Sequence, residues 1–544
     1  MDSTLEHARV LVEACRGVVG GAVGRLAADT VRNGRVDLDL LDRDQVLAYD
    51  VATVAGRVTA AEHLLDYGTL GTLERDLALL YAGEVAADLA GRLAGREDAW
   101  AVGDDSPWHD AARAEAVAAA RSSELIAEVA RAVLDAPDLP RHLAEDLAMV
   151  RASFRDFAQG RVAPVAEEVH RRDLDLPEPI IAELAGMGCF GLSIPERLGG
   201  FAEGEGPDDL LSMMVVTEEL SRGSLGVAGS LITRPEILSR ALVRGGTPEQ
   251  RERWLPAIAA GELMCAVAVT EPDHGSDVAG LTVTATRDGD DYVVDGTKTW
   301  CTFAGRADLV LLLARTGTAD ERHRGLSLFV LEKPPYPGHA WTHEGEGDGR
   351  IEARAIGTLG YRGMHSFELS FSGYRVPAAN LVGGTGGLGR GFYLQMDAFA
   401  NGRLQTAARA LGVMQAAFEA AVAYANAREV FGVPLSTYQL TQAKLARMAA
   451  AIAACRWFSH AVARLLAEGN GQLEASMVKS VSCLAAESLT REAMQIHGGM
   501  GYAEEYAVSR YFVDARVLSI FEGADETLAL RVIVRRLIEE LHSL

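Results

Sequence analysis

The spacing of hydrophobic and polar residues divides the chain into helical stretches around one stretch of strands. Near the start, apolar residues recur at helical spacing on one predicted face: Leu47, Val51, Val54 and Val58. The stretches 77–93 and 111–134 show the same spacing and are also predicted to be helical. Pro and Asp residues in 135–140 end this all-helical part of the chain.

A second helical stretch, 141–263, follows. Within it, Thr247 before Pro248 is typical of a helix start, because Thr caps free N–H groups and Pro suits the first turn. From 264 to 378, short apolar runs separated by turn signals predict a compact β unit. Helical spacing then returns and continues almost to the C-terminus. The order helix, helix, sheet, helix predicts a mainly α fold with a central β domain.

The 544 residues are too many for one ordinary compact domain. With 49% hydrophobic and 24% charged residues, the composition is that of a globular protein. The changes of pattern predict these domains: 1–137, a helical N-terminal extension; 138–263, an N-terminal helical domain; 264–378, a middle β domain; 379–544, a C-terminal helical domain.

The formal net charge of −24 argues against a nucleic-acid partner and against an anionic membrane surface. No apolar run approaches the ~20 residues of a membrane span, and the first residues predict no signal peptide. The cysteines show no paired or metal-ligand spacing: Cys15, Cys189, Cys265, Cys301, Cys455 and Cys483. We therefore expect buried thiols in a reducing compartment, and a cytoplasmic location.

Two further patterns are not interpreted as sites. The stretch 384–389 fits G-x-G-x-x-G, but no strand–turn–helix unit surrounds it, so a loop before a long helix is expected. The stretch 343–348 offers metal-ligand residue types in a Gly-rich run, which favours a solvated loop. No metal is predicted.

Three segments, far apart in the sequence, carry the candidate chemistry: TEPDHGSD at 270–277, GTKTWCT at 296–302 and IFEG at 520–523. The last of them is expected to open the final helix. In this order they resemble the acyl-CoA dehydrogenase family, from about Glu145 to the C-terminus. The resemblance implies a helical domain, a β-barrel-like domain and a four-helix-bundle domain, here preceded by the extension. It also implies FAD-dependent α,β-dehydrogenation of an acyl-CoA, with an electron-transfer flavoprotein as electron acceptor.

The resemblance assigns FAD contacts residue by residue. Val269 and Thr270 match the pyrimidine edge of the flavin, Trp300 the ring and Thr302 the region of N5, while Ser276 matches the CoA side. In isolation, Trp300 would more often be a core residue. A second set matches the family residues that bind the FAD of a neighbouring subunit: Arg428, Phe431, Gln495, Gly498 and Gly499. This second set implies a homodimer or a dimer of dimers.

Glu522 is the candidate catalytic base. Abstraction of a proton α to a thioester requires a carboxylate in a dry site, where desolvation raises its pKa. A Glu favoured by a helix N-terminus is the alternative interpretation. Some family members place the base before a CoA-contacting Arg, but here Gly402 precedes Arg403, so Glu522 has no rival there. Gly523 is placed beside the substrate, and Ala524 replaces a family Thr that contacts FAD.

Arg234 is the candidate that bears on the substrate. An Arg near an acyl pocket suits a substrate that ends in a carboxylate, because a charge-assisted pair compensates burial. Alternatively, Arg234 pairs with Glu236 or reaches solvent. The extension, 229–237 and 344–364 resemble a branch of the family that acts on short branched dicarboxylic thioesters. Tyr361 and His365 are further pocket candidates by resemblance and position, with a loop aromatic and a surface His as alternatives.

Other functions remain open at this stage. A fatty acyl-CoA dehydrogenase of β-oxidation would act on straight chains and give Arg234 no role. An acyl-CoA oxidase would pass electrons to oxygen directly. A nucleic-acid-binding flavoprotein of the same fold would need a basic surface. The extension could bind a partner, support a dimer or cap the fold.

Overall fold

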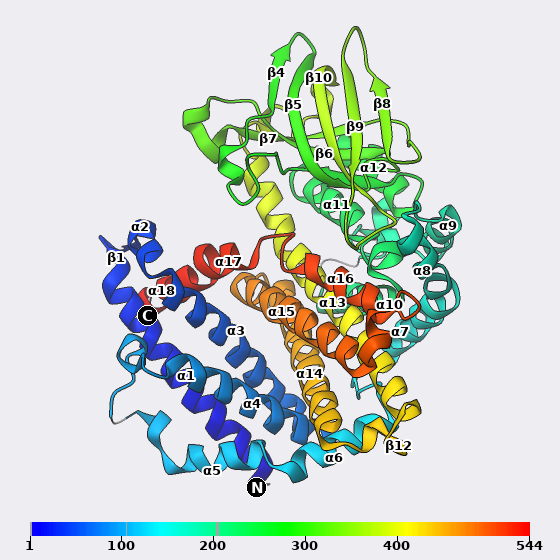
Figure 1. Ribbon diagram of the computed structural model, residues 1–544. Helices are drawn as coiled ribbons and strands as arrows, with labels where there is room; N and C mark the ends of the chain where they lie inside the picture. Colours follow the sequence, from blue (N-terminus) through cyan, green and yellow to red (C-terminus); the bar gives the residue numbers. More distant parts are fainter. Residues whose placement is uncertain (1–2, 105, 203–205, 544) are drawn as a thin grey trace. The chain divides into compact units, whose positions relative to one another are not determined.

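The computed structural model describes residues 3–104, 106–202 and 206–543. The chain forms two compact units, which we call the bundle unit and the sheet unit. The bundle unit comprises Met1–Ala144 and Thr406–Leu544, and the sheet unit comprises Glu145–Gln405. Helices predominate and one curled sheet is central in the sequence, so the predicted fold class is confirmed (Figure 1).

The bundle unit is built from helices of the extension and of the C-terminal part of the chain. The extension supplies α1 Ser3–Thr30, α2 Leu38–Leu41, α3 Gln45–Tyr67, α4 Thr72–Leu93, α5 Ala111–Ala120 and α6 Ser123–Asp135, with the small hairpin β1 Val31–Arg32 and β2 Arg35–Val36. The C-terminal part supplies the end of α13 Gly391–Ala427, then β11 Glu429–Val430, β12 Val433–Pro434, α14 Gln439–Ala467, α15 Gln472–His497, α16 Val508–Leu518, α17 Asp525–Leu528 and α18 Val534–Ser543.

The structure refines two of the sequence expectations. The stretch 111–134 contains two helices, because Arg121 ends α5 and the Ser122 hydroxyl caps α6 by accepting from Leu125 N at 3.2 Å. The segment 520–523 does not open a helix. It forms a turn between α16 and α17.

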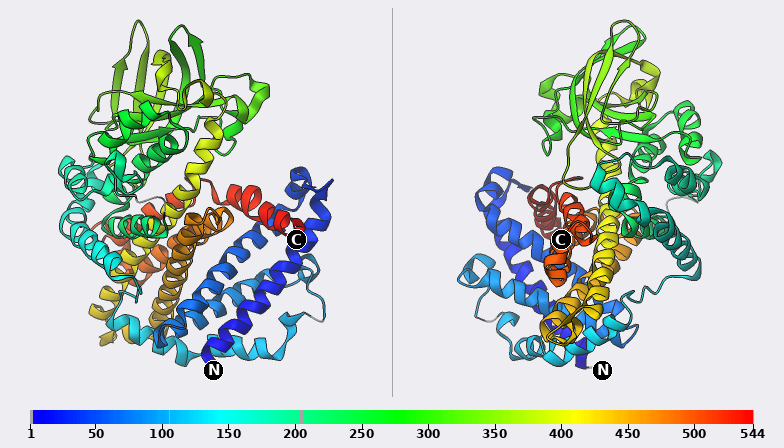
Figure 2. Two further views of the ribbon diagram at one scale, coloured as in Figure 1. Left: turned by 180° about the vertical axis from the view of Figure 1, so that it is seen from behind. Right: turned by 45° about the vertical axis from the view of Figure 1, so that its right-hand side comes forward.

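The extension packs directly on the C-terminal helices, and the two parts lie in one compact unit. Helix α3 lies against α14 and α15 (Figures 1 and 2). Its predicted apolar face is buried: Leu47, Val51, Val54 and Val58 are each at most 4% exposed. Aromatic side chains join the two parts, with Tyr67 beside Trp457 and His63 stacked on Phe458. The extension and the C-terminal helices therefore share one packed core.

Close packing of α3 on α15 gives a testable contact. A Cβ at Gly56 would lie 2.9 Å from Val481 Cγ2 and 3.5 Å from Met477 Cβ. Gly56→Leu is therefore expected to lower the free energy of unfolding by about 1–3 kcal/mol through overpacking. Gly91→Leu is the matched control, because this exposed glycine of α4 has no atom within 4 Å of its Cβ position. Chemical denaturation measures both variants, and equal stability would contradict close docking of the extension.

The sheet unit begins with helices and ends with the start of α13. Its helices are α7 Glu145–Phe157, α8 Ala163–Arg172, α9 Glu178–Gly186, α10 Pro207–Gly223, α11 Thr233–Gly245 and α12 Pro248–Ala259. The predicted start of α12 is confirmed, because the Thr247 hydroxyl accepts from Gln250 N at 3.3 Å. The 384–389 stretch contains a short helical turn, Gly384–Gly387, ahead of α13, and no dinucleotide-binding unit surrounds it within the described residues.

The sheet has eight strands in the order β3-β6-β4-β5-β10-β9-β8, with β7 paired to β6. The strands are β3 Cys265–Ala268, β4 Thr284–Asp288, β5 Asp291–Thr302, β6 Leu309–Arg315, β7 Leu326–Glu332, β8 Ala340–Glu344, β9 Arg350–Ile356 and β10 Ser366–Pro377. Alternate residues of β5 and β10 are buried in an apolar core, which includes Val294, Phe367 and Phe371. Strands β5 and β10 pair antiparallel, with Thr302 opposite Ser366. This register fixes where the Trp300–Thr302 segment ends.

Candidate active site

Glu522 lies in the tight turn between α16 and α17 of the bundle unit. Its φ is +53° and that of Gly523 is +100°, so two successive residues adopt left-handed conformations. Such a conformation is costly for a non-glycine residue and persists only where surrounding contacts hold it. The Glu522 side chain is 10% exposed. The carboxylate is therefore in a dry environment, as the sequence predicts for a base.

The carboxylate of Glu522 is held by two groups of α13. Arg409 Nη2 donates to Glu522 Oε1 at 2.7 Å, and the Thr406 hydroxyl donates to Oε2 at 2.7 Å. Arg409 is fully buried, and its guanidinium also lies 4.7 Å from the Phe521 ring centroid. Arg409 therefore places a positive charge directly against the Glu522 carboxylate. The two contacts fix the orientation of this carboxylate.

Sequence reasoning missed Arg409 and Thr406. The signal was present, because Arg409 is a charged residue within the Ala-rich run of 407–412. A buried Arg requires a partner, and that requirement could have been recognised from the pattern. A further missed residue is Lys479 of α15, which is fully buried and donates to Gly523 O at 2.7 Å. The identity of each partner depends on the tertiary structure.

The second predicted FAD set lies on the bundle unit, at the C-terminal end of α15 and in the turns that follow α13 and α15. The Tyr424 and His497 rings stack at 4.2 Å, which brings the C-terminal ends of α13 and α15 together. All five predicted residues of these turns are exposed: Arg428, Phe431, Gln495, Gly498 and Gly499. Phe431 is 94% exposed with φ +52°, an arrangement with little support from its own chain.

The first predicted FAD set lies on the sheet unit. Trp300 lies two residues before the end of β5, with φ +58°. It is 55% exposed, so it is not the core residue that a strand Trp usually is. Thr302 is buried, and its hydroxyl shares a 2.9 Å hydrogen bond with Ser366. Thr299 N donates to Thr270 O at 2.8 Å, which joins this strand to the segment after β3.

A buried ion pair fixes the same corner of the sheet. Lys298 Nζ donates to Glu271 Oε1 and to Val269 O, both at 2.8 Å. Burial lowers the pKa of Lys298, and the Glu271 carboxylate opposes this shift. Thr270 is half-buried and Ser276 is exposed beyond it. The predicted residues Val269, Thr270 and Trp300 therefore come from two strand ends that are held together.

Arg234 of α11 is buried, with 8% of its surface exposed. Its Nη1 donates to the Tyr361 hydroxyl at 2.9 Å and to Ser230 O at 3.4 Å. Glu236 pairs instead with Arg240, at 2.6 Å. Within the described residues, no carboxylate pairs with Arg234. Both alternatives, a pair with Glu236 and a solvent-exposed guanidinium, are therefore wrong, and Arg234 and Tyr361 are brought together.

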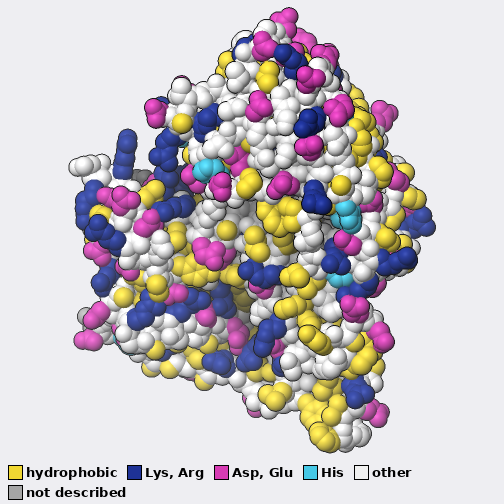
Figure 3. Space-filling model, turned by 45° about the horizontal axis from the view of Figure 1, so that its top comes forward, with side chains coloured by type: hydrophobic (Ala, Val, Ile, Leu, Met, Phe, Trp, Pro, Cys, Tyr) yellow, Lys and Arg dark blue, Asp and Glu magenta, His cyan; other side chains and the backbone are white. Residues whose placement is uncertain are grey.

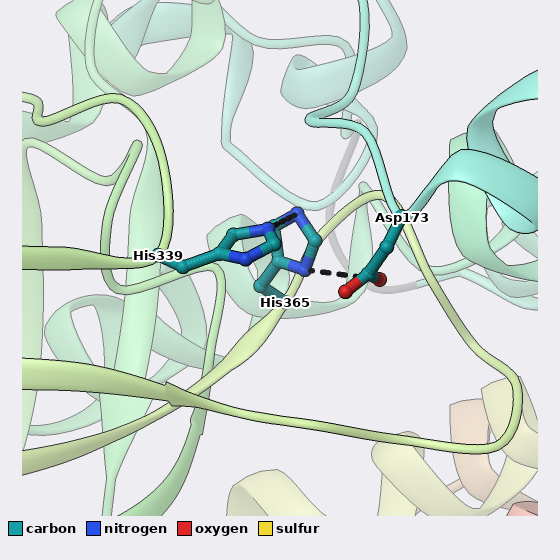
Figure 4. Close-up of side chains that lie close together, drawn as sticks. All are labelled: Asp173, His339 and His365. Atoms are coloured by element: carbon teal, nitrogen blue, oxygen red, sulfur yellow. Dashed lines mark hydrogen bonds and ion pairs between the residues drawn. The ribbon is translucent and has the colours of Figure 1, made fainter.

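His365 is also buried, at 8% exposure, so the alternative of a surface His is wrong. His365 Nε2 lies 3.2 Å from His339 Nε2 and 3.1 Å from Asp175 Oδ1. Its Nδ1 faces Asp173 at 3.8 Å (Figure 4). Burial first, and His339 second, lower the pKa of His365.

The surroundings of His365 include a cavity of about 410 Å³, lined partly by Phe303, Tyr336 and Met364. Asp173, His339 and His365 place metal-ligating atom types within 4.8 Å of one another. Each ring nitrogen of His365 faces another polar side chain, so these residues form a chain of polar contacts. The sequence singled out 343–348 for ligand types instead. His343 belongs to β8, where it contacts the Tyr336 hydroxyl at 3.0 Å, so it is not part of a solvated loop.

Arg403 and Gly402 lie on α13 within the sheet unit, where Arg403 is half-buried and Gly402 is buried. The position that carries the base in some relatives is thus a glycine in a packed helix. Among the described residues, no helix combines the length and apolar character needed to cross a membrane.

Comparison with known proteins gives the family. Models of the N-terminal, middle and C-terminal domains of acyl-CoA dehydrogenases match residues 144–262, 266–373 and 389–538. A (2S)-methylsuccinyl-CoA dehydrogenase from Cereibacter sphaeroides is 45% identical over 401 residues, which cover 73% of this chain and 70% of that protein. The chain belongs to the acyl-CoA dehydrogenase family. It is an oxidoreductase that acts on acyl-CoA.

Solved structures agree with the fold of this dehydrogenase. Butyryl-CoA dehydrogenase from Megasphaera elsdenii is 30% identical, with a TM-score of 0.65 over 72% of this chain and 97% of that one. A glutaryl-CoA dehydrogenase from Mycobacterium smegmatis, in complex with FADH2, is 27% identical, with a TM-score of 0.64 over 73% and 95%. The matched domain models begin at residue 144, after the extension.

FAD is the cofactor of this family, and the exposed groups of the chain fit it. A half-exposed Trp300 at a strand end suits a planar ring system. A Cβ at Gly498 or Gly499 would meet no atom within 4 Å, so the backbone there is open to close approach. Such turns suit phosphate groups, whose oxygens accept from backbone N–H.

Proposed function

We propose that this dehydrogenase converts (2S)-methylsuccinyl-CoA to mesaconyl-CoA, which places it in the ethylmalonyl-CoA pathway. The observation that carries the proposal is Arg234, a buried guanidinium with no carboxylate partner in the described ranges. A buried cation without a counter-charge is costly, and a substrate carboxylate would compensate it through a charge-assisted pair. The 45% identity to a (2S)-methylsuccinyl-CoA dehydrogenase supports the same substrate.

Glu522 is the proposed catalytic base, and it takes the proton α to the thioester. Arg409 and Thr406 keep its carboxylate ionised and oriented before the substrate arrives. The Glu522 backbone N–H is proposed to polarise the thioester carbonyl, with Gly523 beside it, which stabilises negative charge as the proton leaves. FAD, when bound, supplies the acceptor for the β-hydrogen. Trp300 and Thr302 are proposed to hold the flavin ring.

Substrate recognition is assigned to the 230–237 segment and the loop before β10. Tyr361 has φ +59° and is buried, so its hydroxyl is held on the Arg234 guanidinium. Ser276 and Arg403 are proposed to contact CoA. His365 lies at the end of the loop that carries Tyr361, and it is proposed to border the acyl pocket.

The test follows the absorbance of the protein-bound flavin after addition of methylsuccinyl-CoA or, separately, butyryl-CoA. Bleaching by methylsuccinyl-CoA alone is the expected result. Bleaching only by butyryl-CoA would support a straight-chain fatty acyl-CoA dehydrogenase and reject the carboxylate pairing. Comparison of aerobic with anaerobic turnover separates a dehydrogenase from an oxidase.

Arg234→Met is expected to lower kcat/KM for methylsuccinyl-CoA about 10–100-fold, because a charge-assisted hydrogen bond contributes about 1.5–3 kcal/mol. Steady-state kinetics with methylsuccinyl-CoA measures the effect, and the flavin content and melting temperature of the variant should not fall. Arg253→Met is the matched control, since Arg253 pairs with Glu332 at the surface. A loss of activity matched by an equal loss of flavin or of folded protein would show that Arg234 supports the fold alone.

The remaining partners are also proposed. Reduced enzyme passes electrons to an electron-transfer flavoprotein, and exposed Phe431 and Arg428 suit a second subunit of a homodimer or dimer of dimers. The cysteines described are free and buried, which suits the cytoplasm. On the face drawn in Figure 3, Lys and Arg side chains are interspersed with Asp and Glu, which does not favour nucleic acid.

A further inference from the structure

The turn that carries Glu522 is tied to the N-terminal extension by a side chain of α3. The Tyr49 hydroxyl donates to Asp525 Oδ2 at 2.6 Å, and Asp525 comes three residues after Glu522. The Ser480 hydroxyl of α15 donates to the other oxygen, Oδ1. Asp525 is 5% exposed. One oxygen of this buried carboxylate is therefore held by α3 of the extension, and the other is held by α15.

Asp525 in turn fixes the end of the turn. It is the first residue of α17, and its N–H donates to Ser519 O at 3.1 Å, which closes the loop over Glu522. Both Glu522 and Gly523 have positive φ, so the turn depends on contacts at its two ends. Loss of one hydrogen bond to a buried carboxylate would loosen that restraint, because such bonds are stronger than neutral ones.

The extension makes a second contact just beyond α17. Arg531 Nη2 donates to Asp42 Oδ2 at 2.6 Å, and this guanidinium lowers the pKa of Asp42. Helices α1 and α3 also pack against α18. The segment that follows Glu522 thus contacts the extension at Asp525, at Arg531 and along α18. The extension itself lies before residue 144, where the matched family models begin.

We propose that Tyr49 is a positioning residue for the catalytic turn, so that the extension supports the active site as well as capping the fold. It acts through Asp525 and holds the Glu522 carboxylate in the place from which it reaches the substrate. The proposal rests on the proposed role of Glu522. A base must be held to a fraction of an ångström, because small displacements of a reacting group lower the rate steeply.

The test is Tyr49→Phe in the full-length, FAD-loaded enzyme. We expect kcat to fall about tenfold while KM for the acyl-CoA stays within about twofold, since the lost contact serves catalysis and not binding. Amide hydrogen exchange of the 520–524 segment should become faster. The melting temperature should stay close to that of the parent protein.

Tyr67→Phe is the matched control on the same helix. Its hydroxyl also makes one hydrogen bond, to Pro140 O at 2.8 Å, but lies 18 residues along α3, about 27 Å away. This variant should keep kcat and the exchange rate of 520–524. Equal effects of the two variants, or no effect of Tyr49→Phe, would overturn the proposal. Full turnover by Glu522→Gln would instead reject the proposed base, and the exchange measurement would still report on the Tyr49 contact.

Discussion

Glu522→Gln is expected to lower turnover by about 10²–10⁴-fold, the usual contribution of a general base. The amide oxygen of Gln can still accept from Arg409 or Thr406, both of which lie 2.7 Å from the carboxylate oxygens. The fold and the flavin content should therefore be retained. Rapid-mixing measurement of flavin bleaching by methylsuccinyl-CoA would give the rate of the chemical step.

Glu526→Gln provides the matched control for the base. Glu526 lies four residues later on α17 and is exposed, so its removal should leave the bleaching rate unchanged. If Glu522→Gln bleached as fast as the parent enzyme, another group would have to take the proton. The same spectra report whether FAD is bound, so a loss of cofactor would not be mistaken for a loss of base.

Arg409→Met is expected to lower the free energy of unfolding by about 3–5 kcal/mol, because it leaves the Glu522 carboxylate without its cation in a dry site. The Arg409 side chain is 0% exposed and that of Glu522 is 10% exposed. Chemical denaturation at neutral pH measures the change. The double variant Arg409→Met, Glu522→Gln should recover part of the loss, since no charge is then left unpaired.

Arg447→Met is the control for the ion pair. Arg447 pairs with Glu84 at 3.0 Å but is 43% exposed, so its loss should cost less than about 1 kcal/mol. A similarly small change for Arg409→Met would show that water or another group compensates Glu522. Failure of the double variant to recover stability would assign the loss to packing of the Arg409 stem and not to its charge.

Much of the fold could be predicted from local pattern. The apolar face of α3 and the Thr247 cap are properties of neighbouring residues, and both are confirmed. The interruption at Arg121 was missed, because helical spacing of alanines continues across it and only the Ser122 cap marks the new helix. The ion pair between Glu236 and Arg240 could also have been predicted from the sequence. Positions 236 and 240 share a helix face, whereas 234 and 236 do not.

The sequence by itself determined the family, the cofactor and the order of the domains. These depend on motifs whose chemistry is local, such as the strand end at Trp300 and the Glu522–Gly523 turn. Only the tertiary structure decided which groups meet those motifs. Arg409 on Glu522 and Tyr49 on Asp525 join residues 113 and 476 positions apart. The physical reason is that burial requires each charge to find a partner, but packing alone selects which one.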